Sequence, residues 1–224
     1  MRGMRKYYEA YDERYKTAHA AGVSWASTEP TPIVLKTIEK YCPDRSAKLL
    51  EIGCGEGRDA GAVLEKGYDL TATDISPEAI DYCRRTMPEH GERFVVLDCI
   101  AGEHEEKYDF IYSVAVIHML VDDEDRRAFY RFIRAHLRPG GTALVCSMGD
   151  GKTDTKSDIA AAFEEQEREH PSGAMKVAAT SCRMVPFEIF EKEIEEGGLS
   201  IVEEGLTEAF PEFNSLMYAV IRAK

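Results

Sequence analysis

The feature that most constrains this chain is a short apolar run that ends in three alternating glycines, Lys48-Leu49-Leu50-Glu51-Ile52-Gly53-Cys54-Gly55-Glu56-Gly57. The apolar residues are typical of a strand that is buried on both faces of a parallel sheet. The glycines allow a sharp turn and a close approach of the backbone to a ligand. A helical pattern follows, so the amides of the turn would lie at a helix N-terminus, where they can bind polar groups. The sequence therefore predicts a strand, a tight turn and a helix around a ligand site.

The spacing of the glycines indicates the class of ligand. A dinucleotide site has the pattern G-x-G-x-x-G, whereas this turn has E-x-G-x-G-x-G and places Arg58 where the third dinucleotide glycine would stand. The pattern resembles the first motif of the class I S-adenosylmethionine (SAM)-dependent methyltransferases. That resemblance implies that the methionine end of SAM is held by Glu51, Gly53, Cys54, Gly55 and Gly57. For the motif taken alone, an ordinary turn without a ligand is the alternative.

Two acids follow the next two predicted strands. The strand over 69–74 ends at Asp74, about 20 residues after the glycine turn, where a carboxylate can accept hydrogen bonds from ribose hydroxyls. The strand over 93–97 ends at Asp98. In the resembled family an acid there bonds the adenine amino group, and the amide of the next residue, here Cys99, lies on the ring. A solvated strand end is the alternative for the first acid, and a helix cap or turn is the alternative for the second.

The fourth predicted strand, over 108–114, leads to the position where the family places methyl transfer. The sequence from Asp109 to His118 resembles the D-x-I-x-S…H segment of small-molecule and polyketide-type methyltransferases. A histidine titrates near neutral pH, so His118 is our candidate general base, and a buried, hydrogen-bonded histidine is the alternative. The turn Leu137-Arg138-Pro139-Gly140-Gly141 before the fifth strand also resembles the family. We further expect Ile75 and Ser113 to contact the cofactor.

The N-terminal region predicts a cap over this site. A helix over 4–20 would carry Tyr7, Tyr11 and Tyr15 on one face, because they recur at intervals of four residues. The chain's single tryptophan, Trp25, lies in the loop that follows. In one interpretation these aromatic residues face the cofactor or substrate, together with Met148 and Arg183 from later in the chain. In the other, the tyrosines and Trp25 only pack against the domain.

The order of the predicted elements indicates one α/β domain. We expect a doubly wound, seven-stranded, mainly parallel sheet of the Rossmann-like methyltransferase fold, with an antiparallel last strand and an N-terminal helical cap. The predicted boundaries are a cap over 1–44 and a SAM-binding domain over 45–224. Within it, the polar segment 149–182 is expected to be a lid-like insertion, with a solvated excursion as the alternative.

Three details of the second half complete the expected fold. The insertion should contain an acidic helix near 157–169, and the fifth strand should begin at Thr142. The final strands are expected over 199–206 and 214–222.

The composition excludes several classes of function. A net charge of −13 argues against a large nucleic-acid surface, since non-specific nucleic-acid binding depends on clustered Lys and Arg. The six cysteines have no metal-ligand spacing, which is typical of reduced thiols in a cytoplasmic protein without a bound metal. The sequence has no apolar segment long enough to span a membrane, and its N-terminus does not resemble a signal peptide.

The sequence thus predicts a SAM-dependent methyltransferase that transfers a methyl group to an oxygen, nitrogen or sulfur atom of a small molecule and releases S-adenosylhomocysteine (SAH). One alternative is a SAM-binding regulator without catalysis. A less favoured one is a nicotinamide-dependent oxidoreductase, which the residue at position 58 opposes. The sequence alone does not identify the methyl acceptor or the oligomeric state.

Overall fold

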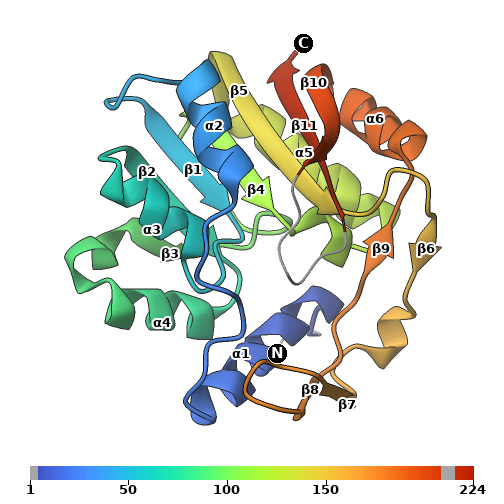
Figure 1. Cartoon of the computed structure of the whole chain (residues 1–224). Coiled ribbons are helices and arrows are strands. Elements are labelled where there is room, and N and C mark those ends of the chain that lie inside the picture. Colours follow the sequence, from blue (N-terminus) through green and yellow to red (C-terminus); the bar gives the residue numbers. More distant parts are fainter. Residues whose placement is uncertain (1–4, 208–214) are drawn as a thin grey trace.

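A computed structural model of the protein describes residues 5–207 and 215–224. The described residues form a seven-stranded sheet with the order β10-β11-β5-β4-β1-β2-β3 (Figure 1). Its strands are β1 (Lys48–Ile52), β2 (Asp69–Asp74), β3 (Phe94–Val96), β4 (Tyr108–Val114), β5 (Leu137–Met148), β10 (Leu199–Thr207) and β11 (Leu216–Ala223). The pairs from β5 to β3 are parallel, and β11 is antiparallel to both of its neighbours. The predicted mainly parallel sheet with an antiparallel last strand is confirmed.

Helices cover both faces of this sheet. The helices α2 (Pro32–Tyr41), α3 (Arg58–Glu65) and α4 (Pro77–Thr86) pack on one face, and α5 (Asp123–His136) and α6 (Phe187–Glu196) pack on the other. Successive buried residues of a strand contribute to different cores because their side chains point to opposite faces of the sheet. Leu49 belongs to the first core and Leu50 to the second. The short 3-10 turn η2 (Pro88–Arg93) precedes β3, and the 3-10 turn η3 (Ile117–Met119) follows β4.

The N-terminal segment crosses the carboxyl edge of the sheet. It consists of the 3-10 turn η1 (Tyr7–Glu9) and the helix α1 (Ala10–Ala20), so the predicted helix over 4–20 is confirmed from residue 7 onward. Position 4 lies outside the described residues. The Tyr7 hydroxyl donates to Asp125 at the start of α5, and Asp12 accepts from the Ser76 hydroxyl at the start of α4. The segment therefore contacts elements on both sides of the sheet.

The polar insertion folds differently from the prediction. The acidic helix expected near 157–169 is wrong: this stretch contains only the short 3-10 turn η4 (Ile159–Ala161) and the strand β7 (Glu165–Arg168). Strand β7 pairs with β8 (Met175–Ala178), while β6 (Thr155–Lys156) pairs with β9 (Arg183–Met184). The β7–β8 hairpin lies beside α1 (Figure 1). Packing of Val177 against the rest of the molecule outweighs the low strand propensity of the glutamates.

Two further boundaries differ or cannot be compared. Strand β5 begins at Leu137 and not at Thr142, because Leu137 already pairs with Tyr108 of β4. A register irregularity then separates this pair from the next one, Phe110 with Thr142. The last two strands are confirmed where they are described. The expected start of the final strand at position 214 lies outside the described residues.

Candidate functional site

The turn after β1 is held against the end of β2. The amides of Gly53 and Cys54 both donate to the carbonyl oxygen of Thr73, at 2.7 and 2.8 Å. Gly53 and Gly55 adopt left-handed backbone conformations, with φ of 77° and 54°. A Cβ atom on Gly53 would collide with Val116, and one on Gly55 would lie 2.8 Å from the Tyr15 hydroxyl. The turn therefore requires glycine at both positions, and neighbouring side chains pack directly on it.

Asp74 joins the glycine turn to the next helix. One carboxylate oxygen accepts from the amide of Gly55, and the other accepts from the amide of Ser76, both at 2.8 Å. Burial raises the pKa of Asp74 above its ordinary value, and the two backbone N–H groups oppose that shift. The structure places the predicted ribose-binding acid at the glycine turn, with the half-buried Ile75 directly after it.

Asp98 follows β3, the neighbour of β2, so the two predicted acids lie at adjacent strand ends. One oxygen of Asp98 accepts from the amides of Ile100 and Ala101, at 2.8 and 3.1 Å. The Tyr8 hydroxyl lies 3.4 Å from the other oxygen. The carboxylate is thus fixed in position, with the half-buried Cys99 next to it. Tyr8 is a member of this site that the i, i+4 tyrosine pattern did not include.

Two other predicted residues lie inside the sheet below the turn. Glu51 is buried and accepts from the Tyr112 hydroxyl at 3.0 Å, and burial raises the pKa of Glu51 well above its ordinary value. The Ser113 hydroxyl is also buried and donates to the carbonyl oxygen of Ile52 at 3.0 Å. Both side chains are held within the core that supports the glycine turn.

The predicted aromatic residues of the cap have different partners. Tyr15 packs on Gly55, whereas the Tyr7 hydroxyl accepts from the amide of Val121 and donates to Asp125. The Tyr11 ring lies 6.1 Å from the Tyr15 ring, centroid to centroid.

Trp25 links the cap to the insertion. Its ring stacks on His170 of the insertion, with the centroids 5.7 Å apart. Its backbone amide donates to Glu56, the glutamate within the glycine turn, at 2.7 Å. The structure therefore brings Tyr15 and Trp25 to the turn and commits the Tyr7 hydroxyl to the start of α5.

His19 also connects the cap to the turn, and the sequence did not reveal it. Its two ring nitrogens lie 2.8 Å from a Glu56 oxygen and 2.7 Å from a Glu78 oxygen. The ring stacks on Tyr82 with centroids 4.4 Å apart. Glu78 and Tyr82 lie far from His19 in sequence, so only the folded chain shows the cluster. The acidic residue at the centre of a glycine turn is the one signal that could have indicated a partner there.

His118, the candidate base, lies in η3 and is only 3% exposed. Burial is the main cause that lowers the pKa of His118 to about 4, and the positive charge of Arg126 lowers it further. The imidazole is therefore neutral at pH 7. It accepts a proton more weakly than an ordinary histidine would.

Two residues that were predicted on the substrate side, Met148 and Arg183, lie near the carboxyl edge of the sheet. Met148 ends β5 and is half-buried. Arg183 donates to the carbonyl oxygen of Val121 at 3.0 Å and to the Asp123 carboxylate at 2.5 Å. Arg183 thus fixes the end of the insertion to the start of α5.

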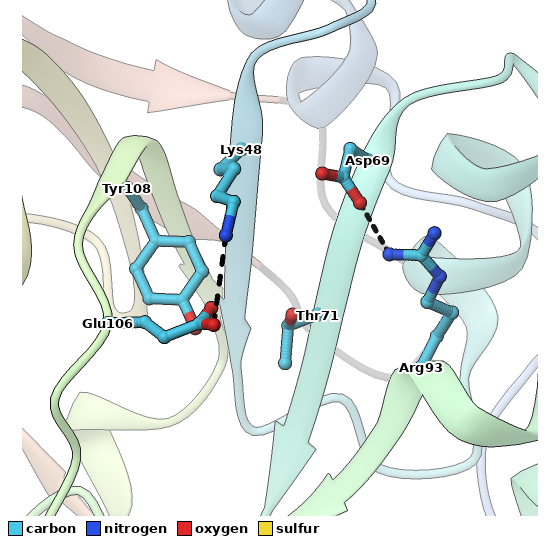
Figure 2. A pocket seen from close by; sticks show the side chains of 6 residues that line it. All are labelled: Lys48, Asp69, Thr71, Arg93, Glu106 and Tyr108. Atoms are coloured by element: carbon cyan, nitrogen blue, oxygen red, sulfur yellow. Dashed lines mark hydrogen bonds and ion pairs between the residues drawn. The ribbon is translucent and has the colours of Figure 1, made fainter.

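A polar hollow of about 190 Å³ lies at the other edge of the sheet (Figure 2). It is lined by Lys48, Asp69 and Tyr108, the first residues of β1, β2 and β4, and by Thr71, Arg93 and Glu106. Its charges pair with one another: Lys48 with Glu106, and Arg93 with Asp69. This hollow is separate from the glycine turn, because it lies at the amino ends of the strands.

No group of three or more His, Cys, Asp or Glu side chains in residues 5–207 and 215–224 is arranged to hold a metal ion. Among the helices described, none combines the length and apolar character needed to span a bilayer.

Comparisons with known proteins agree with this geometry. Residues 50–143 match the family model described as "Methyltransferase domain". The chain is 32% identical over 108 residues to "Hemagglutinin 1" of Eikenella corrodens, covering 46% of this chain and 35% of the relative. It is 29% identical over 121 residues to "Ubiquinone biosynthesis O-methyltransferase" of Xylella fastidiosa, covering 52% of this chain and 48% of the relative. The chain thus spans half or less of the length of these relatives.

A solved structure extends the likeness of the fold to nearly the whole chain. The glycopeptide N-methyltransferase MtfA, crystallised with SAM, superposes with a TM-score of 0.65 at 16% identity and covers 90% of this chain and 97% of its own. At that identity the likeness concerns the fold. Together with the family match, it shows that residues 50–143, which match the methyltransferase domain model, lie within a fold shared with SAM-dependent methyltransferases.

Proposed function

We propose that this chain transfers a methyl group from SAM to an oxygen, nitrogen or sulfur atom of a small molecule. The observation that carries the proposal is the bond between the Gly55 amide and Asp74. It joins a glycine turn to a carboxylate at the carboxyl ends of adjacent parallel strands, where open α/β sheets bind ligands. The family match and the relatives that are named methyltransferases support the same function.

The residues at this edge fit SAM. Gly53 and Gly55 carry no side chains of their own, so their backbone can approach a ligand closely. Each oxygen of Asp74 accepts one backbone N–H, and a carboxylate offers about four lone-pair sites, so acceptor capacity remains for two ribose hydroxyls. We assign the adenine to Asp98 and the Cys99 amide, with Ile75 beside the ring. The buried Glu51 and Ser113 support the turn from below.

When bound, SAM supplies a methyl group on a positively charged sulfur, which is already a good leaving group. The protein then needs mainly to align the acceptor and exclude water. We assign water exclusion to the cap with Tyr15 and Trp25, and to the insertion over 149–182 as a lid. The stacking of Trp25 on His170 supports this assignment because it joins cap and insertion above the glycine turn.

A general base is dispensable in this scheme. If His118 takes a proton, it does so as a neutral imidazole whose pKa of about 4 makes it a weak base. Its burial favours the alternative of a structural histidine, and its kinetic test is the single-turnover rate of His118→Ala. Loss of about 10²- to 10⁴-fold in rate with unchanged SAM affinity would support the base. A destabilised but fully active variant would end that assignment.

The alternatives differ in their binding and turnover. A SAM-binding regulator would bind SAM without turnover. A nicotinamide-dependent oxidoreductase is disfavoured because Arg58 begins α3 at the position of the third dinucleotide glycine.

The net charge of −13 supports a small-molecule acceptor over nucleic acid. Six free cysteines support a cytoplasmic location.

The test is calorimetric titration of the purified chain with SAM and SAH, repeated in the presence of excess NAD. We expect one site for both ligands and no competition from NAD. Release of SAH with a panel of oxygen, nitrogen and sulfur acceptors then separates the enzyme from the regulator. A chain that binds NAD and not SAH would overturn the proposal.

A further inference from the structure

Arg14 is a buried positive charge at the seam between α1 and the β7–β8 hairpin. It is 4% exposed. Its Nε and Nη2 atoms both donate to the carbonyl oxygen of Ala178, at 3.3 and 2.9 Å. The guanidinium carbon lies 4.9 Å from the centroid of the Tyr11 ring and 4.8 Å from that of the Trp25 ring. The planar group is therefore held by one carbonyl oxygen and two aromatic rings.

This environment lacks the negative charge that a buried cation requires. Among residues 5–207 and 215–224, no carboxylate forms an ion pair with Arg14. Burial lowers the pKa of Arg14, and the nearby cation Arg168 lowers it further. With its amide in the orientation that its neighbours require, Gln166 accepts from both arginines at 3.2 Å. A neutral amide does not compensate for the desolvation of a buried charge, so the site is electrostatically incomplete.

The position of Arg14 on α1 indicates which ligand would complete it. Tyr8, Asp12, Tyr15 and His19 recur at helical spacing, and they contact Asp98, Ser76, Gly55 and Glu56. That face of α1 therefore lies on the predicted cofactor residues. Arg14 is bonded instead to β8 of the insertion. The charge thus lies on the side of the cap toward the insertion, close to the glycine turn but on a different helix face.

We propose that Arg14 binds a carboxylate group of the methyl acceptor, and that the acceptor is a small carboxylic acid. The inference rests on the function proposed above. Because Nε and Nη2 already donate to Ala178, we assign the acid to the donors of Nη1. A hydrogen bond from a guanidinium to a carboxylate is charge-assisted, which makes it stronger than a bond to a neutral acceptor. The rings of Tyr11 and Trp25 fix the plane of the guanidinium and so the direction from which the acid binds.

Trp25 provides the readout, because it is the only tryptophan in the chain and lies over the Arg14 guanidinium. The SAH-saturated protein is titrated with benzoate, phenylacetate and anthranilate, and with the neutral amide of each acid, while tryptophan fluorescence is followed. We expect at least one acid to bind about tenfold or more tightly than its amide. Arg14→Gln should abolish the preference, and Arg14→Lys should keep part of it. The exposed neighbour serves as the matched control: Arg168→Gln should leave the preference in place.

The remaining outcomes separate the possible failures. Wild-type protein that does not bind SAH would defeat the proposed function itself. If SAH binds but no acid is preferred over its amide, or if the preference survives in Arg14→Gln, the inference about Arg14 is overturned.

Each variant is also titrated with SAH and with 5′-methylthioadenosine, which lacks the amino-acid carboxylate. If Arg14→Gln weakens binding of SAH only, Arg14 binds the cofactor and the acceptor assignment is wrong.

A structural role for Arg14 makes a different prediction. It would lower the melting temperature of Arg14→Gln and leave acid selectivity unchanged. Arg14→Met, which keeps the length and packing of the side chain, is the second variant. We expect its melting temperature to equal or exceed that of the wild type, because it removes a buried charge without an anionic partner. A large decrease in the melting temperature of Arg14→Met would overturn the inference.

Discussion

Two buried arginines lie in two regions of this molecule and have opposite surroundings. Arg126, between α5 and α6, is 1% exposed and donates from Nε and Nη2 to the two oxygens of Glu193, each at 2.7 Å. Its Nη1 donates to the carbonyl oxygens of Ile117 and Leu120. Although burial lowers the pKa of Arg126, the Glu193 carboxylate raises it above its ordinary value. Arg14, at the seam of cap and insertion, has only neutral partners among the described residues.

The difference teaches that burial by itself does not identify the role of a charge. A charge whose hydrogen bonds and counter-charge all come from the protein holds the fold together. A charge that is equally buried but lacks a counter-charge is consistent with a partner from outside the chain. Arg126 has its counter-charge within the protein, whereas we propose that the carboxyl edge of the sheet takes its remaining interactions from ligands.

The largest effect should come from Asp74, which we assign to the proposed ligand site. Asp74→Ala should reduce the affinity for SAH by about 1.5 to 3 kcal/mol for each of the two ribose bonds lost. Calorimetry on protein whose fold is checked by circular dichroism measures it, with Asp74→Asn as a milder control. A folded Asp74→Ala variant with unchanged affinity would remove the ribose assignment. If the variant unfolds, Asp74 belongs with Arg126 among the structural charges.

The next effect should be on stability at Arg126. Arg126→Met leaves Glu193 buried without its partner, and we expect a loss of about 3 to 5 kcal/mol in the free energy of unfolding. The double variant Arg126→Met, Glu193→Leu should recover much of it, since a packed apolar pair replaces the ion pair. Urea denaturation measures both. Arg14→Met in the same assay should change stability little, and an equal loss in both single variants would break the comparison.

The pH dependence of stability tests the region around His118. The pKa of His118 is about 4 in the folded protein and lies below the ordinary value of 6.5, so the unfolded chain binds a proton more readily than the folded one. The free energy of unfolding therefore has its full value above pH 6.5 and falls as the pH decreases toward 4. The shift corresponds to about 3 kcal/mol. Urea denaturation at several pH values should show this loss in the wild type and a flatter profile in His118→Gln. Identical profiles would show that His118 does not titrate in this way.

The smallest effect should come from Tyr7, whose hydroxyl anchors the N-terminal end of the cap to the start of α5. Tyr7→Phe removes a hydroxyl that donates to Asp125 and accepts from the amides of Val121 and Asp122. We expect a loss of about 0.5 to 1.5 kcal/mol, visible as faster hydrogen exchange in the first turn of the cap. Tyr11→Phe is the control, because the ring of Tyr11, and not its hydroxyl, makes the contact with Arg14. Equal exchange in the two variants would contradict this anchor.

The sequence predicted the sheet well because its strands and helices carry local signals. The apolar run with Leu49, Leu50 and Ile52 is followed directly by glycines, which end the strand. Ser76 stands before Pro77 at a helix start, and its hydroxyl accepts from the amide of Ala79. Those signals act over a few residues, so one sequence is sufficient to find them.

The insertion and the cap depend on contacts that are distant in sequence. The strand β7 contains two glutamates, which are rare in strands, and it forms because it pairs with β8 beside α1. Arg14 has no local feature that separates it from an exposed helical arginine. Its burial results from Ala178, 164 residues further along the chain. The sequence therefore indicated the residues around the glycine turn more completely than those between the cap and the insertion.

The side chain of Glu56 has a consequence for how the cap is attached. One of its carboxylate oxygens lies 2.8 Å from the His19 ring and accepts from the amide of Trp25, and the other accepts from the amide of Ala26. A single side chain of the glycine turn therefore holds both the end of α1 and the loop that follows it. Any change in the conformation of the turn would be passed to both segments of the cap at once.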